Sequence, residues 1–369
     1  MPILVEHFKH WNALIIVAAL FAGCAAPPQQ VDDRGPPVFP KPPDPPRFVF
    51  ERTILGTGSV RSLSDRDRLR SLLTGSAVRE GIGFAKPFDV AVRKGRIHVT
   101  DTVHRSVMVL DFSSSESFVI GDRGDDGDLH KPLGIAVDEQ KHVYVVDATL
   151  RGVQIYDPTG NFERRIDLSR FTKRPSGVDV SADGARLYVV DTGGVDSDDH
   201  RLVVIDGANG NLIRTIGTRG KKDGEFNLPR DVRVGSNGLI YVTDGGNFRV
   251  QAFTQDGKHV RSWGQPGRRL GQFSRPKGIS VDKDDNVYVV DAAFGNFQIF
   301  NADGELLMFV GDRSTTPEPA KYMLPAGIDV DEDGRIYMID QFFRKLDVYR
   351  PVEITEADGW LGRKDMAKK

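Results

Sequence analysis

Pro132-Leu-Gly-Ile-Ala-Val-Asp138, followed after a turn by Val143-Tyr-Val-Val-Asp147, is one of six copies of a single pattern. Each copy opens at proline, runs through an alternating apolar strand and ends a second strand at aspartate. The copies are Pro87–Asp101, Pro132–Asp147, Pro175–Asp191, Pro229–Asp244, Pro276–Asp291 and Pro325–Asp340. Their closing aspartates lie 44 to 53 residues apart, a period typical of propeller blades. Because one such unit cannot bury its apolar faces alone, the repeat predicts an all-β, six-bladed β-propeller of four-stranded blades.

The sixth copy of the repeat lacks its fourth strand, and a segment near the start of the chain can supply it. Each full copy continues into a third and a fourth strand, joined by turns such as Asn301-Ala-Asp-Gly304. The sixth copy stops after its third strand, Leu346-Asp-Val-Tyr-Arg-Pro351. The missing strand is found near the start of the chain, in Phe48-Val-Phe-Glu-Arg-Thr-Ile-Leu-Gly56, so we predict that this N-terminal strand closes the ring and removes a sheet edge. A short helix capped by Ser64 is predicted over residues 64–73.

The first residues have the features of an export signal. Lys9 precedes an apolar run over residues 11–22, shorter than the roughly 20 residues of a membrane-spanning helix. Leu20-Phe-Ala-Gly-Cys24 resembles a bacterial lipobox, which implies a signal peptide over residues 1–23 and a membrane anchor through lipidation of Cys24. An ordinary cleaved leader and an uncleaved anchor are the alternatives. Ala25 resembles the pattern of lipoproteins sent to the outer membrane, so we expect a cell-envelope location facing the periplasm or the cell surface.

Composition divides the rest of the chain. Nine of the 21 prolines fall in residues 24–46, which predicts an extended tether or, alternatively, a segment bound by a proline-recognising partner. We expect the propeller over residues 47–354 and a C-terminal tail over 355–369. A single cysteine excludes an internal disulfide, and a net charge of −2 argues against bulk binding of nucleic acid.

The repeat also sorts charges onto two faces. Connections between blades and those between second and third strands share one face, which collects basic residues beside the opening prolines: Lys86, Lys131, Arg174, Arg230, Arg275 and Lys277. The same face receives Arg105, Arg151, Arg219, Lys221, Lys222, Arg249, Arg268 and Arg269. The opposite hairpins are acidic, at Asp138, Glu139, Asp157, Asp183, Asp206, Asp256, Asp282, Asp284, Asp285, Asp303, Asp331, Glu332 and Asp333.

Basic groups around a narrow channel mouth focus an attractive field on anions. We therefore interpret the six basic residues beside the opening prolines as a binding site for an acidic protein surface, an anionic glycan or a small anionic ligand. These residues are Lys86, Lys131, Arg174, Arg230, Arg275 and Lys277. The alternative is local pairing with the recurring aspartates, Arg105 with Asp101 for instance, which does little beyond solvating a surface. For the acidic hairpins, turn chemistry alone accounts for most of the aspartates.

The repeats resemble the NHL family of six-bladed propellers. The resemblance rests on the Pro-x-Gly-Ile-x-Val-Asp openings, the Tyr-Val-x-Asp endings and Gly-x-Phe-x-x-Pro lead-ins, complete in Gly224-Glu-Phe-Asn-Leu-Pro229 and Gly271-Gln-Phe-Ser-Arg-Pro276. It covers about residues 47–354 and implies the fold, which binding modules and enzymes share. Relatives that bind RNA carry additional zinc-binding domains, which one cysteine cannot build, so no nucleic-acid partner is expected.

One enzyme of this family, peptidyl-hydroxyglycine amidating lyase, resembles the chain most over residues 229–281 and holds zinc through histidines just after the blade-opening proline. The matching residues here contain no histidine: Phe88, Leu133, Ser176, Arg230, Lys277 and Ala326. His104, His130 and His200 map to the basic face and are the weak candidates for metal ligands. Residues 329–340 match the acidic spacing of an EF-hand loop, but the repeat places them on strand, turn and strand. No catalytic residue, metal or cofactor is expected.

The sequence thus predicts a lipid-anchored recognition or scaffold module that works through a basic channel mouth. A metal-dependent lyase or hydrolase acting on the same face is the alternative from another class. The third possible function is structural: a propeller that acts as a rigid spacer and binds no ligand.

Overall fold

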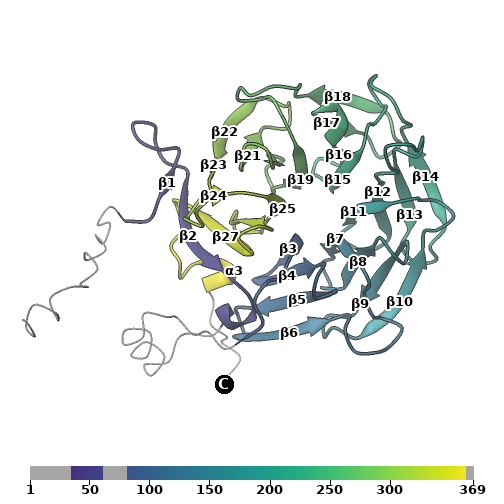
Figure 1. The fold of residues 1–369 in the computed structure, drawn as a ribbon, viewed down its shortest axis with the longest axis horizontal. Coiled ribbons are helices and arrows are strands. Elements are labelled where there is room, and N and C mark those ends of the chain that lie inside the picture. The colour runs from purple at the N-terminus through teal and green to yellow at the C-terminus, as the bar shows by residue number, and fades with distance from the viewer. Residues whose placement is uncertain (1–34, 61–80, 363–369) are drawn as a thin grey trace, which may run out of the picture. The chain divides into compact units, whose positions relative to one another are not determined.

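The computed structural model describes residues 35–60 and 81–362. In these residues, six antiparallel sheets of four or five strands surround a central axis as the blades of a β-propeller (Figure 1). The predicted fold is confirmed. The signal peptide, Cys24 and the helix expected over 64–73 lie outside the described residues. Among the residues described, no helix has the length and the apolar character needed to cross a membrane.

Each blade runs outward from the axis in four strands. The innermost strands are β3 (Pro87–Arg93), β7 (Pro132–Val137), β11 (Pro175–Val180), β15 (Pro229–Val234), β19 (Pro276–Val281) and β25 (Pro325–Val330). The second strands are β4 (Arg96–Asp101), β8 (Val143–Asp147), β12 (Arg186–Asp191), β16 (Ile240–Asp244), β20 (Val287–Asp291) and β26 (Ile336–Asp340). The third are β5 (Ser106–Asp111), β9 (Gly152–Tyr156), β13 (Arg201–Asp206), β17 (Arg249–Phe253), β21 (Asn296–Phe300) and β27 (Lys345–Pro351). The outermost are β6 (Glu116–Ile120), β10 (Phe162–Asp167), β14 (Leu212–Ile216), β18 (His259–Trp263), β22 (Leu306–Val310) and, for the sixth blade, β2 (Phe48–Ile54).

The ring closes as predicted. β2 pairs antiparallel with β27, from Phe48 opposite Pro351 to Ile54 opposite Leu346, and β25 packs beside β3 of the first blade. The closure is also polar, because Glu51 on β2 forms a fully buried 2.8 Å ion pair with Arg335 of the sixth blade. The N-terminal strand is therefore joined to the last blade by backbone and by side chains.

Two short elements pack on the ring outside its four-stranded blades. β1 (Val38–Phe39) pairs with β2, and the Phe39 side chain is buried. Its ring packs edge to face on that of Tyr349, with 5.7 Å between the two ring centroids. The compact unit therefore begins at Pro37, inside the stretch expected to be tether. At the other end, α3 (Gly359–Gly362) buries Leu361 against the sixth and first blades, so part of the expected tail packs on the ring. Two further strands, β23 (Asp312–Arg313) and β24 (Lys321–Tyr322), pair within the connection between blades five and six, and η1 (Thr57–Val60) follows β2.

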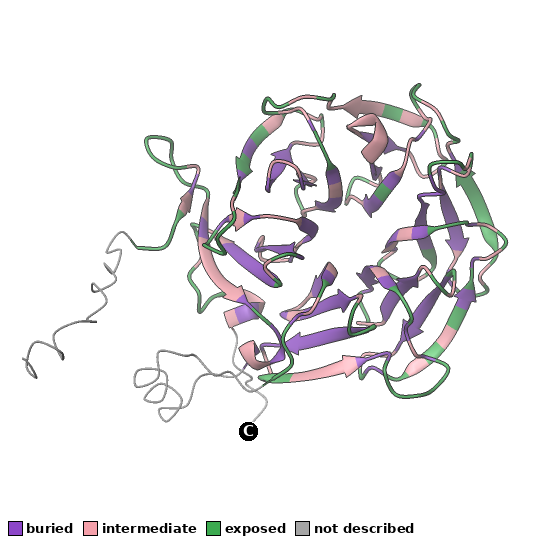
Figure 2. Cartoon of the chain, in the orientation of Figure 1, coloured by how far each residue is buried: buried purple, intermediate pink, exposed green. Residues whose placement is uncertain are grey.

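The hydrophobic core lies between blades. One cluster, for example, joins Val107 and Ile120 of the first blade to Ile135 and Val145 of the second. Every other apolar cluster of the described residues also draws side chains from two neighbouring blades. Figure 2 accordingly shows burial concentrated in the middle strands of each blade, with exposed segments in the loops and on the outer strands. This confirms that the blades stabilise one another.

Candidate functional site

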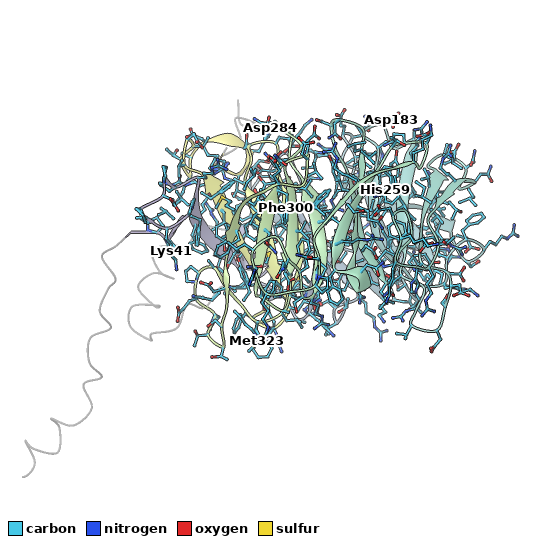
Figure 3. All side chains as sticks on the ribbon, turned by 90° about the horizontal axis from the view of Figure 1, so that it is seen from above. Lys41, Asp183, His259, Asp284, Phe300 and Met323 are labelled. Carbon is cyan, nitrogen blue, oxygen red and sulfur yellow. The ribbon has the colours of Figure 1, made fainter. Side chains whose placement is uncertain are left out.

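The two faces of the ring carry different loops. Figure 3 shows Asp183 and Asp284, in the first hairpins of blades three and five, at one face and Met323, before the sixth blade, at the other. We call the first the acidic face. The second, formed by the connections between blades and between second and third strands, is the basic face.

On the acidic face, the hairpin aspartates hold turns. Asp138 accepts the backbone N–H of His142 at 2.8 Å and the Tyr144 hydroxyl at 3.1 Å. Asp282 has the same contacts in the fifth blade, with the backbone N–H of Asn286 and the hydroxyl of Tyr288, both at 2.9 Å. These contacts agree with the turn-chemistry interpretation.

On the basic face, the closing aspartates hold the backbone of the candidate site. Asp147 is fully buried, and its Oδ2 accepts the N–H groups of His130 and Lys131 at 2.6 and 2.8 Å. Its Oδ1 accepts two N–H groups of the next turn. The equivalent aspartates receive the backbone N–H groups of Lys86, Arg174 and Arg275. In these four blades the aspartates thus bind the backbone that carries the predicted cations rather than the charged ends of those cations. Asp101 makes two more such backbone contacts where the alternative interpretation had a pair with Arg105.

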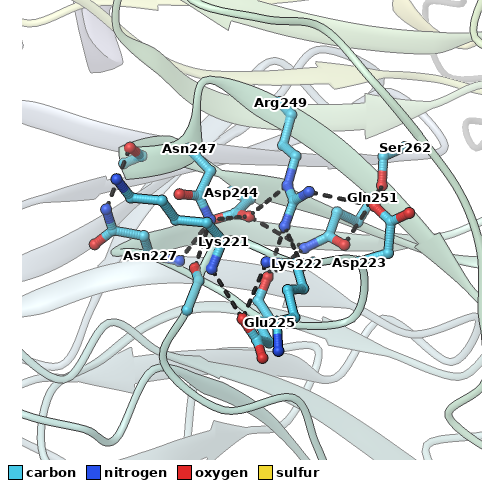
Figure 4. A network of polar contacts seen from close by, with 12 residues as sticks. Lys221, Lys222, Asp223, Glu225, Asn227, Asp244, Asn247, Arg249, Gln251 and Ser262 are labelled. Atoms are coloured by element: carbon cyan, nitrogen blue, oxygen red, sulfur yellow. Dashed lines mark hydrogen bonds and ion pairs between the residues drawn. The ribbon is translucent and has the colours of Figure 1, made fainter.

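Asp244 of blade four also anchors a neighbouring loop (Figure 4). Arg249 donates to Asp244 at 2.9 Å and to the carbonyl oxygens of Lys222 and Glu225 at 2.7 and 2.9 Å. Glu225 in turn accepts the backbone N–H groups of Lys221 and Lys222, both at 3.0 Å. This network fixes the lead-in loop of blade four while the two lysine side chains stay exposed.

A cavity of about 620 Å³ lies at the axis on the basic face. Five of the six predicted cations line it: Lys131, Arg174, Arg230, Arg275 and Lys277. Lys86 does not line it, although its charge acts on Lys277. We call this space the basic cavity. The structure therefore gathers most of the predicted site around one opening.

None of these five cations forms an ion pair with a carboxylate of the described residues, although the charge of Asp340 acts on Lys277. Within the described residues, none of their side chains takes part in an ion pair or a hydrogen bond. Burial, then the like charges of Arg275 and Arg230, lowers the pKa of Lys277 to about 8. Burial, then Arg275 and Arg174, lowers the pKa of Arg230. Cations that repel one another in this way would be stabilised by an anionic group among them.

Two carboxyl groups form the floor of the cavity, and the sequence analysis missed them. Asp89 and Asp231 lie two residues after the opening proline of blades one and four, where the other blades have glycine. Each bridges to the next blade, since Asp89 accepts the N–H of Ile135 at 3.2 Å and Asp231 that of Ile279 at 3.1 Å. The glycines make room for them: a Cβ at Gly177 would lie 2.5 Å from Asp231 Oδ1. The departure from glycine was the signal that could have identified both residues.

The buried Arg233 acts on both floor carboxyls, and its Nη1 lies 3.8 Å from Asp231 Oδ1. Burial, followed by the charge of Asp231, raises the pKa of Asp89 to about 8, so this carboxyl is largely protonated at pH 7. Burial also raises the pKa of Asp231. Deeper in the channel, Asp179 and Asp329 accept the N–H groups of Val234 and Val92, each at 2.7 Å. The carboxyls of the channel therefore join neighbouring blades at the axis.

The three histidines are not brought together. His200 is fully buried, donates from Nε2 to the Gly194 carbonyl at 2.8 Å and accepts the Leu228 N–H at Nδ1. The His104 ring contacts the Gly83 carbonyl oxygen at 3.0 Å, and neither of these residues nor His130 lines the basic cavity. Across residues 35–60 and 81–362, no three histidine, cysteine, aspartate or glutamate side chains form a group suited to a metal ion.

The carboxyl groups of the EF-hand-like segment, residues 329–340, do not form a metal site either. The segment forms β25, a turn and β26, and its carboxyl groups have different partners. Asp329 binds the N–H of Val92 across the blade boundary, whereas Asp331 accepts the Tyr337 hydroxyl at 2.8 Å. The spacing is thus a product of the repeat.

Comparison with known proteins supports the fold. The NHL repeat family matches residues 226–253 and 273–300. A structural-genomics protein of unknown function from Bacteroides thetaiotaomicron superposes with a TM-score of 0.60 at 17% identity, covering 83% of this chain and 76% of its own. A streptogramin B lyase gives 0.54 at 14% identity, covering 73% and 95%. A nidogen/laminin complex gives 0.50 at 16% identity, covering 71% and 92%. At these identities the similarity shows the fold, which an enzyme and a binding complex share.

Proposed function

Because this chain is an NHL-repeat β-propeller with cations gathered at its channel mouth, we propose that it is a recognition module for an anionic ligand or an acidic partner segment. The observation that carries the proposal is that five cations line one cavity without a carboxylate partner among the described residues. Leaving so many like charges together is unfavourable in the empty protein. Binding an anion there would remove the repulsion.

The alternative of a metal-dependent lyase or hydrolase receives less support. No histidine lines the basic cavity, and the rings of His104 and His200 contact backbone carbonyl oxygens instead. The groups that the cavity does offer, cations above two buried carboxyls, are suited to holding an anion in place.

The location of the protein rests on the lipobox-like sequence before Cys24. We propose that Cys24 carries a lipid that anchors the propeller in the cell envelope. Mass spectrometry of the mature protein should find a lipid-modified Cys24 as its first residue, and an unmodified cysteine or an intact leader would contradict this.

The function is tested by reversing the charge of the cavity. Lys131→Glu, Arg174→Glu and Arg275→Glu together should abolish binding of inorganic phosphate and of a polyglutamate peptide, measured by calorimetry. The same variant should lose any partner that in-cell cross-linking recovers with the wild-type chain. A milder variant with glutamine at these three positions, checked for an unchanged melting temperature, guards against misfolding.

The matched control carries Lys221→Glu, Arg268→Glu and Arg269→Glu. These exposed cations belong to the same face but do not line the cavity. If both variants bind the two probes as the wild type does, the proposed function is wrong.

A further inference from the structure

The basic cavity has two chemically different sides. The six residues that directly follow the opening prolines all line it: Phe88, Leu133, Ser176, Arg230, Lys277 and Ala326. Blades one and two contribute the apolar Phe88 and Leu133 to this ring, whereas blades four and five contribute Arg230 and Lys277. This ring of six residues therefore changes from apolar to cationic around the axis, although Lys131 of blade two and Phe248 of blade four also line the cavity.

The symmetry of the ring sets these sides opposite each other. In a ring of six blades, the first blade faces the fourth across the axis and the second faces the fifth (Figure 1). Phe88 thus has Arg230 as its counterpart, and Leu133 has Lys277. One half of the cavity wall can contact an apolar group while the other contacts a charged one.

Of the three further cations that line the cavity, Arg174 and Arg275 strengthen the charged side, whereas Lys131 lies on the side of blade two. Arg275 acts electrostatically on both Arg230 and Lys277, Arg174 acts on Arg230, and all four side chains line the same cavity. Lys131 also lines the cavity and lies close to Leu133 in the sequence. Its charge is not among the named causes that lower the pKa of Arg230 or of Lys277. The positive charge is consequently concentrated on the side of blades three to five.

We propose that the basic cavity binds an amphipathic anion, with its carboxylate, phosphate or sulfate group against Arg230 and Lys277 and its apolar body against Phe88 and Leu133. This inference rests on the proposed function and specifies its ligand. A cavity of about 620 Å³ is of the size that holds small molecules in other proteins. The same chemistry is offered by a free small ligand and by a polypeptide end that carries an acidic residue beside an apolar one.

The direct test compares three probes on the purified full chain by calorimetry. Inorganic phosphate presents the anion alone, benzyl alcohol presents an apolar ring alone, and phenyl phosphate presents both. Phenyl phosphate should bind about tenfold or more tightly than inorganic phosphate, because its ring is removed from water. Benzyl alcohol should bind least.

Two double variants test which side of the cavity binds the ring of phenyl phosphate and which side binds its phosphate group. Phe88→Ser with Leu133→Ser should weaken phenyl phosphate about tenfold and leave inorganic phosphate unchanged. The fold accommodates small residues there, since Ser176 and Ala326 occupy the same position in other blades. Arg230→Met with Lys277→Met should weaken both phosphates. Ile213→Ser, an exposed apolar residue of β14 outside the cavity, is the matched control and should change neither.

The possible failures are distinguishable. If phenyl phosphate binds no better than phosphate, or if the Phe88 and Leu133 variant binds it as the wild type does, the amphipathic ligand is wrong while anion recognition stands. If neither phosphate binds the wild type, both proposals fail. A ten-residue peptide ending in Phe-Glu, compared with N-acetyl-Phe-Glu, separates the sources: tighter binding of the longer peptide assigns a polypeptide, and equal binding assigns a free ligand.

Discussion

At the scale of single residues, the informative positions are those that depart from the repeat. Asp89 and Asp231 replace glycine and are buried at the axis, where their carboxyl groups bridge to the next blade. Their hydrogen bonds offset part of the cost of burial, but the pKa of Asp89 still rises to about 8. Folding is therefore coupled to protonation of the channel floor.

Stability should fall as the pH rises through the range set by Asp89. Its pKa is about 8 in the folded state against 3.8 for the free side chain, so between these values the folded state binds more protons than the unfolded state. The free energy of unfolding then decreases with pH, with a slope of at most about 1.4 kcal/mol per pH unit from this group, and levels off above pH 8.

Urea unfolding between pH 5 and pH 9 measures this slope. Asp89→Asn should flatten it, whereas Glu116→Gln, an exposed change on β6, should not. Identical slopes in the wild type and in Asp89→Asn would show that Asp89 does not retain its proton on folding.

Anion binding should also weaken as the pH rises from 7 to 9, because both Lys277 and Asp89 change charge in this range. The pKa of Lys277 is lowered to about 8, so its positive charge is lost between pH 7 and pH 9 while Asp89 becomes negative. Sulfate is the suitable probe because its own charge is constant over this range. Its affinity should fall several-fold from pH 7 to pH 9 in the wild type and less in Lys277→Arg, because the guanidinium stays protonated. An affinity that does not change with pH in either protein would refute this.

At the scale of elements, β2 is the strand on which the ring depends. Its alternating pattern and the missing place in the sixth blade made it predictable from sequence. β1 and α3 were not predictable, because each buries one isolated apolar side chain, Phe39 or Leu361, whose neighbours show no period. Tertiary packing alone decides whether such a residue is buried.

The ion pair between Glu51 and Arg335 tests the polar part of the closure. Both side chains are fully buried, so Glu51→Ala leaves the buried guanidinium with the more distant Asp333 carboxylate, 3.7 Å away, and should lower the free energy of unfolding by about 3–5 kcal/mol. The double change Glu51→Leu with Arg335→Met should cost less than Glu51→Ala. Lys258→Ala, which removes an exposed 3.5 Å pair with Asp256, should cost at most about 1 kcal/mol. Equal losses in Glu51→Ala and Lys258→Ala would contradict the role of the buried pair.

At the scale of the whole molecule, stability depends on six blades packed in a closed ring. Deleting residues 47–56 removes β2 and exposes the edge of β27, so the melting temperature should fall far more than on deletion of residues 360–369. The second deletion is not neutral, because it removes the buried Leu361. Equal melting temperatures of the two variants would overturn the closure argument.

The repeat also determines how much of the site can be predicted. The period assigns each loop to a face, so the sequence alone is enough to place the basic residues on one side of the ring. It fixes the backbone but not the ends of long side chains: Lys86 has the repeat position of Lys131, yet only Lys131 lines the cavity. The carboxyls at the axis were missed because aspartates were interpreted as turn residues of the acidic hairpins or as local partners of the cations, and Asp89 and Asp231 are neither.

The register of the closing strand has a mechanical consequence. β2 enters the pair at Phe48 and β27 leaves it at Pro351, and these two residues lie opposite each other. A force applied to the two ends of the propeller would therefore peel the strands apart one hydrogen bond at a time, instead of shearing all of them together. The strand pair that we expect to hold the ring against heat would therefore unzip under tension once β1 and α3 have detached.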